Sequence, residues 1–440
     1  MQNIYLYSLG CEKNTVDGEH ILAILKKNGF NVVDNAEEAD VIVINTCAFI
    51  EDSKKESIDA IFDHSMYKKY GKCKRLIVSG CMSERYKDNF LDMFKEVDSA
   101  IGIHDLEKIL TAVEKDGFHD AGDSNKEYKE YGERVNTGSD YSVYIRISDG
   151  CHANCSFCAI PSIRGEHRSR KIEDIVKEAE NYAKKGAKEI NLIAQETTFY
   201  GYDIYNKLAL PDLLKELSKV DGIEWIRVLY QNPVVLNDEI IDAFFNTDKV
   251  VPYFDIPLQH VDKEILKDMN RGTRGYKFYR EMIDKIRSYD KNAVIRTSLI
   301  VGFQGETKES FKKLLKFVRN AELDRVGVFT YSEEENTKAL TLNKPKISRH
   351  TKMMLREKLM KEAIEVSERR LERFIGQTID VLIEKKEDDD KFIGRSKYDA
   401  PEVDGYVEVY IDNGKKINIG DIVKVNITHN TEYDLIGNLV

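Results

Sequence analysis

Apolar runs alternate with helical patterns over the first part of the chain. The runs Ile4 to Leu9, Asp40 to Asn45 and Arg75 to Ser79 are each followed by a segment long enough for a helix. Short apolar runs separated in this way are typical of parallel β-strands joined by crossover helices. The pattern therefore predicts an α/β domain over residues 1–118, built on a doubly wound parallel sheet.

A second and longer series of strand and helix patterns runs from Tyr141 to Tyr331. Helical patterns such as Ile172 to Lys185 and Tyr276 to Tyr289 separate most of its β-like runs. The repeat predicts an open (βα)6 partial TIM barrel over residues 141–369. Residues 119–140 are polar and aperiodic, and we expect a linker there. The six β-like runs are Tyr144 to Ile147, Glu189 to Ala194, Trp225 to Tyr230, Tyr253 to Ile256, Val294 to Val301 and Val326 to Tyr331.

The pattern changes again near the end of the chain. One long helix is predicted from Ser348 to about Phe374. Beyond Gly376, short alternating runs are punctuated by glycines. This favours a small antiparallel β-barrel of the OB type over residues 370–440.

The most informative chemical feature is a triplet of cysteines that follows the first strand of the predicted partial barrel. Cys151, Cys155 and Cys158 form a C-x3-C-x2-C run. Such a run can ligate three irons of a 4Fe-4S cluster and leave the fourth iron open to a small molecule. Zinc is the alternative, but its structural sites need four ligands and no second cysteine pair follows. We expect His152, inside the run, to be a solvated loop residue and not a ligand.

Three more cysteines end the three apolar runs of the first domain. Cys11, Cys47 and Cys81 are separated by 36 and 34 residues. Because one βα unit takes about 30 residues or more, each cysteine should lie at the carboxyl end of its strand. The three thiols should then meet at one edge of the sheet and form a second metal site. The alternative is that small buried residues simply gather at strand ends. Cys73 precedes its strand and should be a spectator at the opposite end.

Composition limits the kind of protein. A charged fraction of 33% with a hydrophobic fraction of 42% is ordinary for a water-soluble chain. No apolar run approaches the ~18 residues that a membrane span needs, and the amino terminus lacks the basic region of a signal peptide. We therefore expect a cytoplasmic protein with no membrane partner. Seven cysteines, an odd number, make a disulfide framework unexpected there and favour metal binding.

The negative charge is concentrated in the predicted barrel. The whole chain has a net charge of -10, and residues 376–440 hold 14 Asp and Glu against 8 Lys and Arg, a net charge of -6. Such a surface repels nucleic-acid phosphates and attracts basic proteins. The alternative is that Glu387 to Asp390 forms only a solvated hairpin tip.

The cysteine triplet, with Phe157 before its last member, resembles the radical S-adenosylmethionine superfamily. Together with the three-cysteine first domain and the terminal barrel, it looks like the methylthiotransferases, whose terminal barrel is of the TRAM type. The resemblance implies two 4Fe-4S clusters, one held by Cys151, Cys155 and Cys158 and one by Cys11, Cys47 and Cys81. It also implies bound S-adenosyl-L-methionine.

The family has two branches, and three motifs of this chain resemble the one that modifies an aspartate of the twelfth small-subunit ribosomal protein. These motifs are Ser8-Leu-Gly-Cys-Glu-Lys-Asn14, Asp255-Ile-Pro-Leu-Gln-His260 and Val328-Phe-Thr-Tyr-Ser332. Glu12 and Gln304 depart from the pattern, since proline is common at both positions. The other branch, 2-methylthiotransferases acting on N6-isopentenyl or N6-threonylcarbamoyl adenosine of transfer RNA, is the alternative. Only under that alternative is transfer RNA a partner.

The resemblance also implies a mechanism and roles for further residues. A 5'-deoxyadenosyl radical would remove hydrogen from the aspartate β-carbon, and the second cluster would hold the sulfur that is methylated and transferred. An external electron donor, a sulfur source and the basic ribosomal protein are the implied partners. The residues implied to contact S-adenosylmethionine or the substrate are Phe157, Gln195, Glu196, Gln259, Arg296 and Gly302. Simple loop packing is the alternative for Phe157, and structural roles are the alternative for Gln259 and Arg296.

Overall fold

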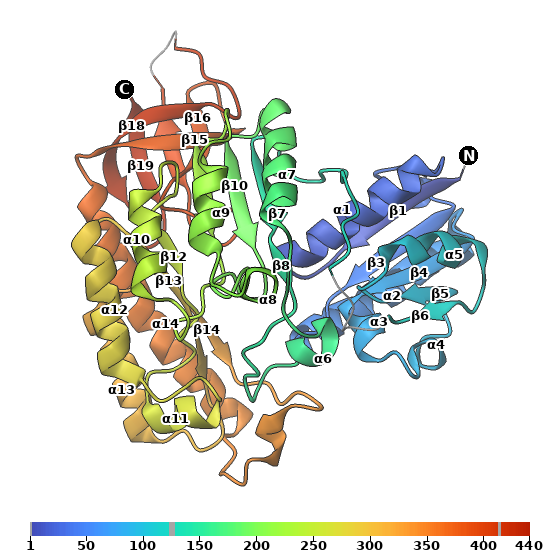
Figure 1. The fold of residues 1–440 in the computed structure, drawn as a ribbon, viewed down its shortest axis with the longest axis horizontal. Helices are drawn as coiled ribbons and strands as arrows, with labels where there is room; N and C mark the ends of the chain where they lie inside the picture. The colour runs from blue at the N-terminus through green and yellow to red at the C-terminus, as the bar shows by residue number, and fades with distance from the viewer. Residues whose placement is uncertain (1, 123–127, 412–414) are drawn as a thin grey trace.

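The computed structural model describes residues 2–122, 128–411 and 415–440. An amino-terminal α/β domain, a larger core and a carboxy-terminal barrel follow one another along the chain (Figure 1). The amino-terminal domain packs against one side of the core, and the barrel packs against one end of it.

The amino-terminal domain is a six-stranded parallel sheet with the order β2-β1-β3-β4-β5-β6. All six residues of β3 are buried, and alternate side chains point to opposite faces. Ile42 and Ile44 join the apolar layer under α2, whereas Val41 and Val43 join the layer under α1 and α5. The predicted doubly wound sheet is therefore confirmed. The elements are β1 (Asn3–Ser8), α1 (Glu12–Lys27), β2 (Asn31–Val32), η1 (Ala36–Glu38), β3 (Val41–Thr46), α2 (Glu51–Tyr70), β4 (Arg75–Gly80), α3 (Cys81–Arg85), α4 (Phe90–Met93), β5 (Ser99–Ile101), η2 (Leu106–Lys108), α5 (Ile109–Glu114) and β6 (His119–Asp120).

The segment expected as a linker is more structured than its sequence indicates. Its first residues form β6 at the edge of the sheet. Arg134 is buried and donates hydrogen bonds to Glu19 of α1 and to Glu178. Polar residues that lack periodicity here form ion pairs between domains, which hydrophobic patterns do not report. Residues 123–127 of this segment lie outside the described residues.

Six parallel strands form the core, with helices along the outside (Figure 1). They occur as two sheets, β11-β10-β7 and β12-β13-β14. The backbone N–H of Gln231 donates to the carbonyl of Asp255 across the junction, at 2.8 Å. The open partial barrel is thus confirmed, and β13 has the predicted bounds. The elements are β7 (Ser142–Arg146), β8 (Ser148–Asp149), α6 (Ile160–Arg164), β9 (Arg168–Ser169), α7 (Ile172–Lys184), β10 (Glu189–Ile193), α8 (Tyr202–Tyr205), α9 (Leu210–Leu217), β11 (Trp225–Val228), α10 (Asp238–Asn246), β12 (Tyr253–Asp255), α11 (Lys263–Asp268), α12 (Gly275–Tyr289), β13 (Val294–Val301), α13 (Lys308–Ala321), β14 (Arg325–Thr330) and η3 (Lys338–Thr341).

The predicted long helix is α14 (Arg349–Leu371), extended by η4 (Glu372–Phe374). The closed barrel that follows has the order β15-β16-β17-β19-β18. All its neighbours are antiparallel except β17 and β19, which pair parallel. The strands are β15 (Thr378–Lys386), β16 (Lys391–Ser396), β17 (Val407–Tyr410), β18 (Ile422–Asn430) and β19 (Leu435–Leu439). Within the described ranges, no helix is both long and apolar enough to cross a bilayer.

Buried ion pairs attach the barrel to the amino-terminal ends of the core strands. Arg395 of β16 donates to Glu189, the first residue of β10, at 2.7 Å. Arg227 of β11 donates to the other oxygen of the same carboxylate at 2.9 Å. Arg325, the first residue of β14, donates to Asp399 of the barrel at 2.9 Å. The barrel therefore covers the end of the core opposite to the carboxyl ends, where α/β barrels place their chemistry.

Candidate functional site

Cys11, Cys47 and Cys81 lie together at one edge of the amino-terminal sheet. They follow β1, β3 and β4, which are neighbours in the sheet, so their strands end side by side. Gly10 has a φ of +93°, and a Cβ atom there would lie 2.8 Å from Cβ of Cys47. Only glycine lets the chain enter α1 this close to Cys47. The predicted convergence of these three cysteines is what the fold produces.

Asn14 holds this edge together from the first turn of α1. Its Nδ2 donates to the carbonyl oxygen of Thr46 at 2.8 Å and to that of Leu9 at 3.1 Å. Its Oδ1 accepts from Sγ of Cys81 at 3.4 Å. One amide side chain therefore fixes the loops that carry all three thiols.

Burial opposes the ionisation of two of these thiols, Cys47 and Cys81. It raises the pKa of Cys81 to about 12 and also raises the pKa of Cys47. The Arg164 guanidinium opposes the effect at Cys81. Cysteine binds metals as the thiolate, so a buried thiol of this kind becomes a ligand when a metal shares its charge. The all-thiolate donor set fits an iron–sulfur cluster.

The second set, Cys151, Cys155 and Cys158, lies in the loop between β8 and α6. Backbone N–H groups point at two of the sulfurs, from Ala153 to Cys151 at 3.4 Å and from Ile160 to Cys158 at 3.5 Å. Hydrogen bonds to sulfur stabilise cluster thiolates and tune their potential. Burial raises the pKa of Cys158 to about 12 and that of Cys151 still further. This loop therefore also fits a cluster held by three thiolates.

The geometry of both sets differs from that of a site for one metal ion. Among the residues that the structure describes, no three Cys, His, Asp or Glu side chains converge on a single ion position. A zinc ion requires such convergence. In a 4Fe-4S cluster each cysteine binds a different iron. Each set holds three cysteines, one ligand fewer than a structural zinc site needs, which favours clusters over the zinc alternative.

Arg164 connects the two sets of cysteines. It ends α6, six residues after Cys158, and its side chain is buried. Its Nη2 lies 3.6 Å from Sγ of Cys81 and 2.8 Å from Asp17 of α1, and its Nη1 lies 3.1 Å from Asp149. The helix that follows the triplet therefore contacts Cys81 of the other set at the junction of the two domains.

Gln195 and Glu196, expected to contact S-adenosylmethionine, follow β10 beside the triplet. Glu196 is buried, and its Oε2 lies 3.7 Å from Sγ of Cys151 and 2.9 Å from Nδ1 of His152. Oε1 of Gln195 is buried and has no hydrogen-bond partner among the described residues. Buried polar atoms are normally paired, so this oxygen is available to a donor group of a ligand. Both side chains fit the implied contact with an amino group.

Phe157 and Gly302 are placed by packing. Phe157 packs against an apolar cluster that includes Phe303 and Tyr331. Gly302 follows β13 with a φ of +74°, and a Cβ atom there would lie 2.3 Å from the side chain of Lys352. Position 302 therefore requires glycine because the side chain of Lys352, on α14 of this chain, lies so close to it.

Arg296 and Gln259 were expected to reach the methionine carboxylate or the substrate. Nη1 of Arg296 instead lies 2.8 Å from Asp255, and its Nε lies 3.8 Å from Asp404 of the barrel. Burial lowers the pKa of Arg296, but these two carboxylates and Tyr253 raise it far above its usual value. Gln259 has a φ of +65°, and its backbone pairs with β13 through Ser298 and Ile300. Internal ion pairing, which spacing does not reveal, occupies the Arg296 side chain.

Two residues beside the triplet have contacts that sequence reasoning did not predict. The ring of His152 stacks on Phe199, with centroids 3.5 Å apart, and its side chain is about one third exposed, so this loop residue is only partly solvated. Arg271 is buried and donates to Sγ of Cys155 at 3.7 Å and to the carbonyl of Pro257 at 2.6 Å. Nothing in the local pattern around Arg271 signals this contact, because it joins positions 116 residues apart.

Three family models match consecutive parts of the chain. The model described as the radical SAM superfamily matches residues 145–318. The model described as uncharacterized protein family UPF0004 matches residues 3–102, and that of the TRAM domain matches residues 375–440. The three matches coincide with the core, the amino-terminal domain and the barrel.

Full-length relatives are also similar. The chain is 46% identical to ribosomal protein uS12 methylthiotransferase RimO of Thermoanaerobacter sp. (strain X514), over 99% of this chain and 100% of that protein. It is 45% identical to the protein of the same name from Aquifex aeolicus (strain VF5), over 99% and 96%. A solved structure, the radical S-adenosylmethionine methyltransferase TsrM from Kitasatospora setae, has a similar fold, with a TM-score of 0.55, 14% identity and 75% of each chain covered.

Proposed function

Since the chain belongs to the family of ribosomal protein uS12 methylthiotransferases, we propose that it adds a methylthio group to the β-carbon of an aspartate of that ribosomal protein. The observation that carries the proposal is the contact between Arg164, which ends the helix after the triplet, and Cys81 of the other cysteine set. One set alone would serve radical formation, and a second set beside it supports the transfer of sulfur. The relatives named for uS12 match over the whole chain, which favours this branch over the transfer RNA alternative.

Two 4Fe-4S clusters are part of the proposal. Cys151, Cys155 and Cys158 would hold the one that binds S-adenosylmethionine, and Cys11, Cys47 and Cys81 would hold the other. When bound, these groups supply the radical that removes hydrogen from an unactivated carbon and the sulfur that replaces it. No protein side chain is basic enough to remove such a proton, so the chemistry needs the cofactors.

The chain's own side chains prepare the site for this chemistry. Gln195 and Glu196 would orient the amino group of S-adenosylmethionine next to Cys151, since a carboxylate and a free carbonyl oxygen both accept from an ammonium. Arg271 and the backbone N–H groups of Ala153 and Ile160 stabilise the thiolates of the triplet. Arg164 would do the same for Cys81 and fix the distance between the two clusters.

The charge of the barrel supports a protein substrate. With a net charge of -6 over residues 376–440, the barrel attracts a basic ribosomal protein and repels transfer RNA. The proposal also includes an external electron donor and a sulfur source, because reduction of the first cluster and renewal of the sulfur both require them.

Mass spectrometry of the ribosomal protein tests the function. Cells that lack this chain should contain uS12 lighter by about 46 Da, the mass of the added methylthio group, and the intact gene should restore it. An unchanged uS12 mass together with loss of a methylthio group from transfer RNA would overturn the choice of substrate. Inert clusters that form no 5'-deoxyadenosine after reduction would overturn the enzymatic role itself.

A further inference from the structure

One stretch of this acidic chain is strongly basic. Residues 336–356 contain six Lys and Arg and no Asp or Glu, whereas the whole chain has a net charge of -10. We name this stretch the basic segment. It includes η3 and the start of α14, and in Figure 1 it lies in the orange part of the chain between β14 and α14.

The basic segment packs directly on the loop of the cysteine triplet. The backbone N–H of Ala339 in η3 donates to the carbonyl of Ser156 at 2.7 Å, and Ser156 lies between Cys155 and Cys158. The side-chain amide of Gln304 donates to the carbonyl of Ala339. Ala339 is buried in the same apolar cluster as Phe157. η3 therefore lies one hydrogen bond from Ser156, which directly follows Cys155 and stands two positions before Cys158.

The outer face of the basic segment is apolar in part. Leu340 is 45% exposed, directly after the residue that contacts Ser156, and Met354 is 56% exposed. Exposed cations flank these side chains. Lys338 and Arg349 have no ion-pair partner among the described residues. Apolar side chains flanked by exposed charges are typical of surfaces that bind a partner transiently.

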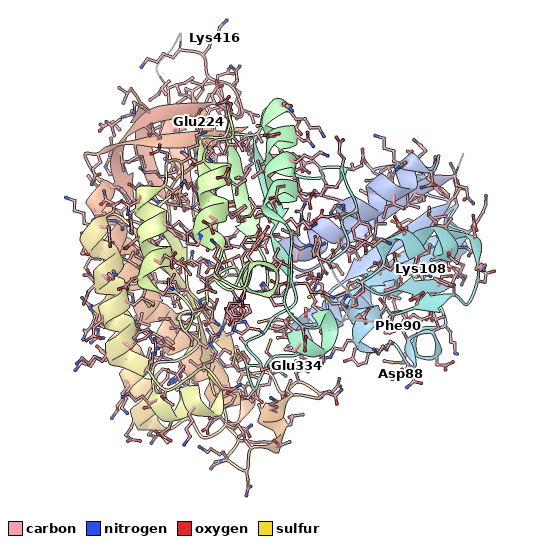
Figure 2. All side chains as sticks on the ribbon, in the orientation of Figure 1. Asp88, Phe90, Lys108, Glu224, Glu334 and Lys416 are labelled. Carbon is pink, nitrogen blue, oxygen red and sulfur yellow. The ribbon has the colours of Figure 1, made fainter. Side chains whose placement is uncertain are left out.

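The acidic residues near the basic segment do not cancel its charge. Glu334 is buried between Lys54 and Arg85 of the amino-terminal domain, each 2.9 Å away, and Figure 2 labels it between the two domains. Glu333 pairs with Lys346 at 2.6 Å, and Asp268 pairs with Lys344. These pairs neutralise two of the six cations. The exposed Glu335 lies 3.6 Å from Arg85, and the exposed Glu357 directly follows the segment. Lys338 and Arg349 have no ion-pair partner among the described residues, so the segment keeps a net positive charge.

We propose that the basic segment is the docking surface for a small acidic electron-transfer protein. This inference rests on the proposed function, which requires one electron to enter the cluster held by Cys151, Cys155 and Cys158. For a flavoprotein donor, the flavin hydroquinone is oxidised to the semiquinone and releases one proton to water. The single electron enters that cluster and makes its charge more negative by one. Docking at η3 brings the donor next to Ser156 of the triplet loop.

The electron-transfer protein and the protein substrate carry opposite net charges. A basic ribosomal protein is repelled by the basic segment and attracted by the acidic barrel, so the two partners bind different surfaces. Ribosomal RNA is the other anionic partner that the cations would fit. Leu340, Met353 and Met354 favour a protein, because phosphate contacts do not require exposed apolar side chains.

Stopped-flow oxidation of flavodoxin hydroquinone tests the proposal. The variant with both Lys338→Glu and Arg349→Glu should oxidise flavodoxin about tenfold more slowly than the wild type at low salt. The difference should shrink at high salt, where surface charges are screened. Lys177→Glu with Lys215→Glu is the matched control, because both lysines are exposed on the outer helices α7 and α9. Leu340→Asn should slow the reaction at both salt concentrations.

Reduction with dithionite tests the function of the site independently of docking. This small reductant needs no docking surface, so all variants should form 5'-deoxyadenosine with dithionite at the wild-type rate and contain the same amount of iron. An unchanged flavodoxin rate in the double variant would overturn the proposal. Loss of binding to the small ribosomal subunit with an unchanged flavodoxin rate would instead assign the surface to RNA. Absence of 5'-deoxyadenosine from the wild type with dithionite would count against the proposed function and not against docking.

Discussion

The guanidinium of Arg164 lies 3.6 Å from Sγ of Cys81, although the two residues are 83 positions apart. Arg164 ends the helix that follows the cysteine triplet, and Cys81 begins the helix that follows β4. Asp17 at 2.8 Å and Asp149 at 3.1 Å pair with the guanidinium, so the buried positive charge has carboxylate partners. A single side chain thus fixes the two halves of the site against each other.

Replacement of Arg164 should change the cluster at Cys11, Cys47 and Cys81 more than it changes the fold. A positive charge near a thiolate stabilises the reduced, more negative form of a cluster. Arg164→Gln should therefore lower the midpoint potential, whereas Arg164→Lys should retain most of it. An EPR-monitored redox titration, in a chain whose triplet is replaced by alanine, isolates this cluster. Equal potentials in the wild type and both variants would leave Arg164 with a structural role only.

Cys81→Ala should separate radical formation from methylthio transfer. The variant should lose one cluster, from about eight irons per chain to about four, and still form 5'-deoxyadenosine. It should not modify uS12. Cys73→Ala is the matched control, since Cys73 is equally buried but lies before β4, at the opposite end of the strand. Its iron content and product yield should equal those of the wild type.

Cys155→Ala should have the complementary effect. Loss of a triplet ligand should abolish both 5'-deoxyadenosine and the methylthio product, while the amino-terminal cluster keeps about four irons per chain. Iron analysis and chromatography of the nucleoside measure the two effects. A Cys155→Ala chain that still cleaves S-adenosylmethionine would show that the radical arises elsewhere.

Glu196→Gln should weaken the binding of S-adenosylmethionine. The buried carboxylate beside Cys151 would lose a charge-assisted hydrogen bond to the amino group, and we expect binding about tenfold weaker. Calorimetry with the iron-loaded protein measures the change in affinity. Glu166→Gln, on an exposed carboxylate in the same loop region, serves as the control and should bind normally. Unaltered binding by Glu196→Gln would exclude the assigned contact.

Glu189→Gln should weaken the attachment of the barrel to the core. Burial opposes ionisation of Glu189, but Arg395 and Arg227 overcome it and lower its pKa from the usual 4.5 to about 2. Without the carboxylate, Arg227 loses its ion pair while buried and Arg395 keeps only its pair with Glu384. Breaking such a buried pair costs about 3–5 kcal/mol. Urea unfolding followed by circular dichroism at neutral pH measures the loss. Glu224→Gln, on an exposed carboxylate near the start of β11, should change little (Figure 2).

The same pair of proteins gives a pH dependence with a defined sign. Because folding lowers the pKa of Glu189, its contribution to stability is fully present above about pH 4.5 and is lost as the pH falls towards 2. The difference in unfolding free energy between wild type and Glu189→Gln should therefore be constant from neutral pH down to about 5 and shrink below it. A difference that grows on acidification would contradict the assigned charge state.

The strands and the two cysteine sets were predictable from the sequence because they depend on local repeats. The length and residue pattern of one apolar run predicted a strand at Val294–Val301, with the same bounds that the structure shows. The regular spacing of one βα unit placed Cys11, Cys47 and Cys81 at one sheet edge, since parallel strands of similar length end together. The alternation and glycine spacing after Gly376 likewise indicated the closed barrel.

The contacts between domains were decided only by the tertiary structure. Arg164, Arg296 and Arg271 lie in unremarkable sequence, yet each finds its partner more than 40 residues away, at Cys81, Asp255 and Cys155. Such pairs follow from how whole domains dock. The sequence around a charged residue does not indicate which distant residue will be its partner. The same holds for the basic segment, whose net charge is visible in the sequence. The segment packs on the triplet loop through Ala339 and Ser156. This contact joins residues that are far apart in the sequence and that no local pattern links.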